Sequence, residues 1–323
     1  MSLLLIGFMG GVLAANDPPS ASNVVAIPAV SSIPVINTND TVENAYYKVM
    51  VDDDAAEKEV LGWMADADAF AKAGGTGPSR TLNLKIQQRL DAIKQEYEDF
   101  IEIHPRHVNI RLAFGSFLND GHDDDGAFKQ WEAARQLAPT NPAPWNNLGK
   151  YYLEHDNPTN AFTYYGKALE LNPSQAVYYH NLAAAVYLFR AAARAYYHLD
   201  EAQVFDKAQS LYQQALKLDP DDFVLSTDYA QSFYGINPPR WKDGLAAWTE
   251  ALKLARDELE REGVYLQMAH IHLELGQYDQ ARSDLNVVTN GEYARLKGPL
   301  ERDLNKAIAS AKTNAPPPVP AGK

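Results

Sequence analysis

The sequence predicts an all-α protein, a solenoid of stacked helix pairs with a helical cap at each end. Three observations lead to this class. Apolar and small residues recur at helical spacing, the pattern repeats after 34 residues, and turn-forming residues separate the two helices of a unit. Neither helix of such a unit can bury its apolar stripe alone, so neighbouring units are expected to stack.

The first 41 residues are expected to lie outside the solenoid. Residues 3–14 read LLLIGFMGGVLA, an apolar run that is too short to span a bilayer but has the length of a signal-peptide core. We expect residues 1–15 to be a signal peptide, with cleavage after Ala14 or Ala15, and the protein to be periplasmic or extracellular. No Lys or Arg precedes the run, so a cytoplasmic protein with a disordered apolar N-terminus is the alternative. Residues 16–41 contain four prolines and are expected to be a disordered linker.

Residues 42–107 are expected to form an N-terminal helical cap and half a repeat. Helical patterns cover about 53–73 and 82–103. The glycine-rich stretch 73–78 between them lacks the Gly-Lys-Ser/Thr ending of a phosphate-binding loop. We therefore interpret it as a hinge between two helices.

Residues 108–290 contain the repeats, and the clearest unit opens at Pro142. Its first helix carries Trp145, Leu148, Gly149 and Tyr152. Its second helix carries Ala161, Tyr165 and Ala168, and Pro173 closes the unit. One period earlier the equivalent positions hold Arg111, Phe114, Gly115, Leu118, Ala127, Trp131, Ala134 and Pro139. The small residues allow close approach of helices, and the large ones fill the space between layers.

An insertion of 13 residues near 189–201 interrupts one unit of the array. It reads FRAAARAYYHLDE, and its alanines favour helix. We expect both helices of this pair to be longer, by about six residues or roughly 9 Å each. Tyr196 and Tyr197 near the tip would then form a second contact site or a dimer surface, or else pack on an adjacent helix.

The end of the chain is expected to close the solenoid. A capping helix is predicted within 291–311, where Leu300, Leu304 and Ile308 share one stripe from about Pro299 onward. Residues 312–323 end in APPPVPAGK and are expected to be a disordered tail, with a polyproline ligand as the alternative.

These residues resemble the tetratricopeptide repeat (TPR) family. The family pattern has Trp, Leu-Gly and Tyr on the first helix, Ala, Phe and Ala on the second, and a closing Pro. The resemblance covers roughly residues 81–285, and the unit at Pro142 fills every position if Tyr165 stands for Phe. It implies a right-handed α-solenoid whose concave face is lined by the first helices. It also implies a non-enzymatic scaffold or adaptor that binds a peptide or helix of a partner protein on that face.

The resemblance places a set of candidate peptide-binding residues on the concave face. They combine amides with aromatic anchors and are Leu112, Ser116, Asn119, Asn146, Lys150, Leu153, His180, Tyr187, Thr227, Gln231 and Tyr234. The alternative is an ordinary solvated face. One TPR subfamily grips acidic chaperone tails through Lys, Asn and Arg, but the matching positions here are Leu112, Ser116, Asn147, Val177 and Asn181. Only Asn147 fits, so we do not expect a chaperone-tail receptor. A self-assembling structural protein, joined through the inserted hairpin or end to end, is the second hypothesis.

Composition and motifs disfavour other functions. The chain has 29 basic and 42 acidic residues, so binding to nucleic acid or to anionic membranes is disfavoured. The absence of cysteine excludes disulfides and thiolate chemistry. Residues 121–126 partly match a calcium loop, but Gly121 occupies the first ligand position. With no catalytic motif among the scattered histidines, we expect no enzyme activity, metal or cofactor.

Overall fold

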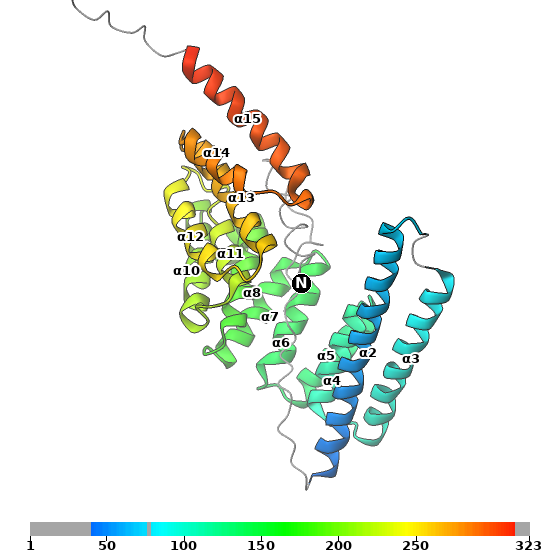
Figure 1. Ribbon diagram of the computed structural model, residues 1–323. Coiled ribbons are helices and arrows are strands. Elements are labelled where there is room, and N and C mark those ends of the chain that lie inside the picture. Colours follow the sequence, from blue (N-terminus) through cyan, green and yellow to red (C-terminus); the bar gives the residue numbers. More distant parts are fainter. Residues whose placement is uncertain (1–39, 76–78, 314–323) are drawn as a thin grey trace, which may run out of the picture. The chain divides into compact units, whose positions relative to one another are not determined.

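The computed structural model describes residues 40–75 and 79–313, which are almost entirely helical and include no strand (Figure 1). None of the helices in these ranges is both long and apolar enough to cross a membrane. The expected signal peptide, most of the linker and nearly all of the C-terminal tail lie outside the described residues. The described chain divides between Tyr151 and Tyr152 into two compact units, here called the N-terminal unit and the C-terminal unit.

The N-terminal unit contains two long helices and the first complete helix pair. The long helices are α2 (Thr41–Lys72) and α3 (Arg80–Ile103), and the pair is α4 (Val108–Asp120) and α5 (Asp124–Leu137). Helix α6 (Pro142–Glu154) contains the division between the units. Trp131 of α5 packs so closely on α4 that a Cβ atom at Gly115 would lie 2.3 Å from its Nε1. Glycine is therefore the residue that permits this pair to form.

The C-terminal unit continues the array. Its helices are α7 (Pro158–Leu171), α8 (Ala176–Leu188), α9 (Arg190–Tyr197), α10 (Glu201–Leu218), α11 (Phe223–Gln231), α12 (Trp241–Leu254), α13 (Glu258–Glu274), α14 (Tyr278–Val287), the 3₁₀ turn η2 (Gly291–Tyr293) and α15 (Ala294–Thr313). Helices α8 and α10, α11 and α12, and α13 and α14 pack as pairs, and each pair packs on the next. The predicted α-solenoid of helix pairs is thus confirmed.

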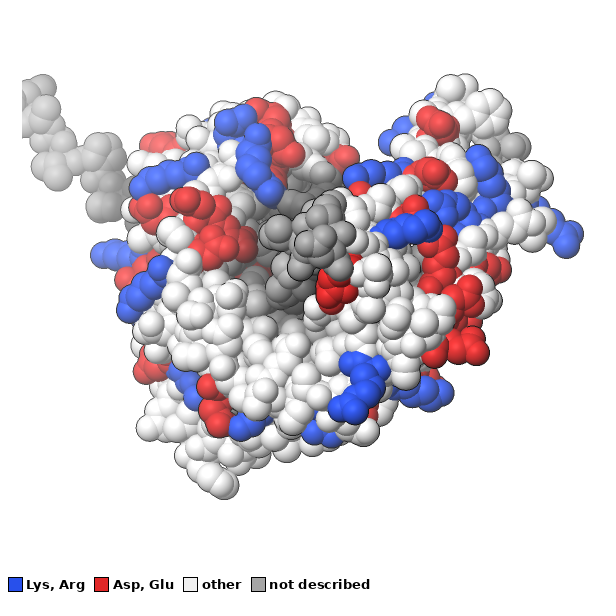
Figure 2. Space-filling model, turned by 90° about the horizontal axis from the view of Figure 1, so that it is seen from below, with Lys and Arg blue, Asp and Glu red and all other residues white. Residues whose placement is uncertain are grey.

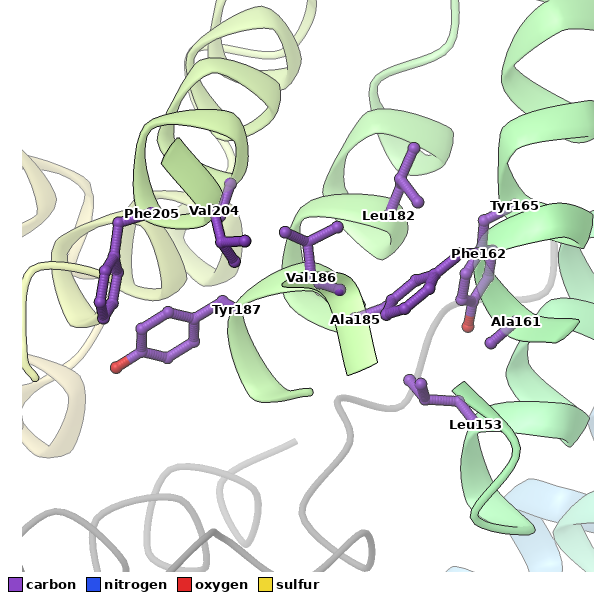
Figure 3. Packing of buried hydrophobic residues seen from close by; sticks show 12 residues of the cluster. Leu153, Ala161, Phe162, Tyr165, Leu182, Ala185, Val186, Tyr187, Val204 and Phe205 are labelled. Atoms are coloured by element: carbon purple, nitrogen blue, oxygen red, sulfur yellow. The ribbon is translucent and has the colours of Figure 1, made fainter. Parts of the chain in front are cut away.

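Apolar side chains from successive pairs interdigitate to form the core of the C-terminal unit. Figure 3 shows Phe162 and Tyr165 of α7 beside Leu182 and Ala185 of α8. On the other side of α8, the ring centre of Tyr187 lies 6.3 Å from that of Phe205 on α10. The small and large positions predicted for the clearest unit behave as expected here, since Ala161, Tyr165 and Ala168 are fully buried.

The expectation that the insertion lengthens both helices of its pair is wrong. Helix α8 ends at Leu188 with the same 13 residues as α4, while α10 is extended to 18 residues. The rest of the insertion forms the separate helix α9, which ends at His198 in the left-handed conformation. Helix α9 packs on α7. By folding back it buries Ala193 and covers Phe162, which a projecting hairpin would leave in water.

The C-terminal cap begins earlier than its sequence pattern suggests. Helix α15 starts at Ala294 and contains Pro299 in its interior, whereas the stripe indicated a start at about Pro299. Leu300 and Leu304 pack in one cluster with Leu285 of α14 and Tyr293 of η2. The short turn η2 leads directly into α15, so the helix forms upstream of the proline.

Candidate functional site

Polar side chains join the first helices of successive pairs in the C-terminal unit. His180 Nε2 of α8 lies 2.7 Å from Asp228 Oδ2 of α11. The Tyr187 hydroxyl donates to the backbone carbonyls of Gln231 and Tyr234, each at 3.1 Å. The Tyr234 hydroxyl donates in turn to Gln267 Oε1 of α13 at 3.0 Å. These contacts, here called the cross-helix bonds, fix the spacing of the three first helices.

Several predicted binding residues are therefore engaged inside the stack. His180, Tyr187, Gln231 and Tyr234 are all buried. Burial raises the pKa of Tyr187 to about 12. It also raises the pKa of Tyr234. Both phenols are consequently neutral hydrogen-bond donors at ordinary pH.

The remaining predicted residues divide between the two units. In the C-terminal unit, Leu153 belongs to the same buried cluster as Ala193 of the insertion, and the half-buried Thr227 donates from Oγ1 to the Val224 carbonyl at 2.9 Å. In the N-terminal unit, Ser116 Oγ donates to the Leu112 carbonyl at 3.2 Å, within α4. Leu112, Asn119 and Lys150 are half-buried, and Asn146 is buried.

A second set of residues, which is less polar than the residues of the cross-helix bonds, forms a stripe on α8, α11 and α13. Helix α8 contains no Asp, Glu, Lys or Arg, and its partly exposed residues include Val177, Ala184 and Leu188, spaced by seven and four positions. On the next two first helices, Val224 and Thr227 of α11 and His270 and Leu273 of α13 are also partly exposed, and the residues of each pair are three positions apart. This set is here called the neutral stripe. The binding residues predicted from the family positions include few members of the neutral stripe. The absence of charged residues from the sequence of α8 could have indicated it.

Aromatic side chains stand at one end of the neutral stripe. The rings of Tyr234 and His270 stack with centres 5.5 Å apart, and the Trp241 ring lies 5.7 Å from Tyr234 and 6.0 Å from His270. Burial lowers the pKa of His270, and the carboxylate of Glu274 only partly opposes this shift. His270 is therefore neutral near pH 7, and Trp241 and His270 are the partly exposed rings of the cluster.

The two tyrosines of the insertion pack mainly on α7. The ring centre of Phe162 lies 5.4 Å from that of Tyr196 and 5.6 Å from that of Tyr197, and the Tyr196 hydroxyl is 3.0 Å from Thr163 Oγ1. Lys207 Nζ lies 4.2 Å from the Tyr197 ring centre. Tyr196 nevertheless keeps 36% of its surface exposed.

The described residues offer little for catalysis or metal binding. His180 pairs with Asp228 and His272 with Asp284, each at 2.7 Å, and within the described ranges no hydroxyl is hydrogen-bonded to either imidazole. No group of three His, Asp or Glu side chains converges in a metal-like arrangement among them. In the calcium-like turn, Asp123 instead accepts a hydrogen bond from the Gly126 amide at the start of α5. Figure 2 shows one face, on which Lys and Arg are scattered among Asp and Glu without a continuous basic field.

Comparison with known proteins identifies the repeats. Residues 143–175 and 263–286 match the tetratricopeptide repeat family. These two segments are tetratricopeptide repeats by sequence. The matched segments cover α6 and α7, and most of α13 and α14, so the TPR units lie on both sides of the insertion. No curated protein matches the sequence.

Solved structures of other proteins are similar to this chain. The structure described as Pseudomonas aeruginosa pilF is 12% identical, has a TM-score of 0.51, and the match covers 79% of this chain and 99% of that one. A TPR protein from Parabacteroides merdae is 14% identical, with a TM-score of 0.45 and coverage of 83% and 98%. YrrB, described as a TPR protein with an unusual peptide-binding site, is 12% identical, with a TM-score of 0.46 and coverage of 67% and 97%.

Proposed function

We propose that this protein is a non-enzymatic scaffold that binds a peptide or helix of another protein on the neutral stripe. The observation that carries the proposal is the composition of α8. A first helix that faces water on one side normally carries charge there, whereas α8 is apolar or neutral on every side. An uncharged, partly apolar stripe that continues onto α11 and α13 is a surface that a partner would cover.

The chemistry of the stripe indicates the kind of segment that it would bind. Val177, Ala184 and Leu188 offer apolar contact, and the partly exposed rings of Trp241 and His270 offer stacking. No charged side chain of α8 opposes the burial of an apolar residue there. The cross-helix bonds hold the three helices in place before binding, which lowers the entropy lost on association. We therefore propose an uncharged, partly apolar partner segment.

The test is capture of partners by the full chain from the native organism, followed by mass spectrometry. An Ala184→Glu and Leu188→Glu double variant places two charges on the stripe and should lose the captured protein. The matched control Leu218→Glu changes an exposed leucine on α10 and should keep it. Circular dichroism of both variants verifies the fold. Equal capture by both variants would show that the neutral stripe is not the binding face.

Self-assembly is the second hypothesis, and the insertion gives it less support than its sequence suggested. Helix α9 folds back on α7 instead of projecting, so the exposed part of Tyr196 is the main remaining contact that it offers. Light scattering over a hundredfold range of protein concentration distinguishes the hypotheses. A mass that stays at one chain excludes self-assembly.

Export remains part of the proposal. Its support is the apolar run at residues 3–14 and the small residues that follow it. Mass spectrometry of the native protein gives the test, because cleavage after Ala14 or Ala15 leaves a defined new N-terminus. A native protein that retains these residues would contradict the proposal.

A further inference from the structure

Helices α2 and α3 extend side by side far beyond the last buried residue on each. Arg89 Nε lies 3.0 Å from Glu59 Oε2, and Lys85 Nζ lies 3.6 Å from the ring centre of Trp63, so the pairing continues along both helices. Yet no residue of 57–72 on α2 or 80–92 on α3 is buried. These two stretches are here called the α2–α3 shelf.

The shelf exists because the next helix pair is short. Helix α4 has 13 residues against 32 in α2, so it is roughly 20 Å long beside a helix of roughly 48 Å. Phe114 of α4 stacks on Tyr97 at 5.0 Å, and Tyr97 donates a hydrogen bond to Asp53 of α2. Burial raises the pKa of Asp53, and the charges of Glu57 and Asp120 add to the shift. Asp120 is the last residue of α4, so α4 ends beside the first half of α2.

The side of the shelf that continues past α4 carries exposed apolar residues. Asp53 accepts its hydrogen bond from Tyr97, the residue that also stacks on Phe114 of α4, and helical periodicity places Val60 and Met64 on the same side of α2 as Asp53. Leu61 flanks them one turn before Met64. Met64 and Leu61 keep 54% and 57% of their surface exposed. Leu61 and Met64 are therefore two large, neighbouring and exposed apolar side chains. Together they form a surface that another helix can cover.

The border of this surface is acidic. Glu57 lies on the same side of α2 as Met64 by helical periodicity, and so does Asp68, which pairs with Lys72 at 2.9 Å. At the end of α4, Lys94 Nζ of α3 lies 3.9 Å from Asp123 Oδ2, which brings the α4–α5 turn to the edge of the shelf. That turn contains Asp120, Asp123, Asp124 and Asp125. The apolar surface is thus flanked by Glu57 on α2 and, at one end, by the carboxylates of the α4–α5 turn.

We propose that the α2–α3 shelf docks a basic amphipathic helix from a partner protein, with apolar residues on Leu61 and Met64 and Lys or Arg against the acidic border. A helix in this position continues the stacking that α4 and α5 begin. A second copy of the same surface is a poor occupant, because the acidic borders would face each other. This site is independent of the neutral stripe, which lies in the C-terminal unit.

The probe for the test is a fluorescent peptide of about 20 residues with leucines at helical i, i+3, i+4 and i+7 spacing and lysines elsewhere. Anisotropy with the full chain should show saturable binding that weakens as salt increases. Two control peptides are needed because the protein is acidic overall. One has glutamate in place of lysine, and the other has the same composition in a scrambled order. Both should bind at least about tenfold more weakly, a difference of about 1.4 kcal/mol.

Variants place the binding on the shelf. A Leu61→Ser and Met64→Ser double variant should lose at least about tenfold in affinity for the lysine peptide. Leu84→Ser is the matched control, because Leu84 is 55% exposed on α3 but lies two residues from Leu82 and from Ile86, on the other side of that helix. These side chains are exposed, so the fold should be unchanged by circular dichroism. Equal binding of the scrambled peptide, or an equal loss in Leu84→Ser, would overturn the proposal.

Discussion

Two helical glycines, Gly115 and Gly166, have opposite surroundings. The Cβ atom of an alanine at Gly115 would lie within 2.5 Å of two atoms of the Trp131 ring, whereas at Gly166 no atom lies within 4 Å. The backbone freedom of glycine costs stability in both helices, but only at Gly115 does close packing compensate for it. At the residue scale, space around the Cβ position decides what a substitution does.

Gly115→Ala should therefore destabilise the protein, and Gly166→Ala should not. We expect a loss of about 1–3 kcal/mol in the free energy of unfolding at Gly115, because the tryptophan must move. At Gly166 we expect a gain of about 0.5–1 kcal/mol. Urea denaturation followed by circular dichroism measures both values. A Gly115→Ala protein as stable as the parent would show that the α4–α5 contact is looser than described.

Glu262 supplies a second prediction at this scale. Its side chain is buried, with 2% of the residue exposed, and accepts hydrogen bonds from the Thr289 amide, the Thr289 hydroxyl and the Asn290 amide. Burial alone would raise the pKa of Glu262, but these bonds and the charge of Lys297 outweigh it and hold the pKa below its usual value. The ionised carboxylate thus ties α13 to the segment that leads into α15.

Glu262→Gln should cost about 1–3 kcal/mol at pH 7. A lowered pKa means that this stabilisation is present above the ordinary glutamate value, about 4.3, and is lost as pH falls through the folded-state value. The difference in unfolding free energy between parent and variant should therefore shrink from pH 5 towards pH 3. Glu258→Gln, at an exposed pair with Arg261, is the control and should change stability little at any pH.

At the element scale, the insertion shows where sequence periodicity stops being informative. The alanines of residues 189–201 indicated helix correctly, but the helix that they form, α9, packs on Phe162, a residue of the preceding unit. The same limit applies to His180, whose partner Asp228 lies 48 residues away. Spacing within one repeat correctly predicts that Ala161 and Tyr165 are buried. It cannot show which side chain the next repeat provides.

The packing of α9 on α7 can be measured directly. Tyr197→Ser removes a half-buried ring from Phe162 and Lys207 and should cost about 2–3 kcal/mol, with a lower melting temperature. Tyr196→Phe removes only the hydroxyl near Thr163 and should cost about 1 kcal/mol or less. If Tyr197→Ser left the melting temperature unchanged, α9 would not contribute to the stability of the unit.

At the scale of the whole molecule, burial is unevenly distributed along the array. Helices α8 and α10 contain fourteen buried residues in all, whereas the α2–α3 shelf contains none within the described ranges. The sequence predicted both regions as helical and made no distinction between a covered and an uncovered helix. That distinction depends on the lengths of neighbouring helices, such as the 13 residues of α4, and not on propensity.

Hydrogen exchange should reproduce this distribution. Amides of residues 57–72 and 80–92 should exchange much faster than those of 180–187, because local opening of the shelf exposes no core. Mass spectrometry of peptic fragments after short and long labelling times tests the order. Slow exchange in the shelf of the free protein would show that something already covers it.

The cross-helix bonds have a geometric consequence for whatever lies across α8, α11 and α13. Tyr187 and Tyr234 each link one first helix to the next, so the distance between successive helices is set by side chains of fixed length. The three helices therefore present their side chains at fixed intervals. A partner segment can contact all three helices only if its own side chains recur at the same interval.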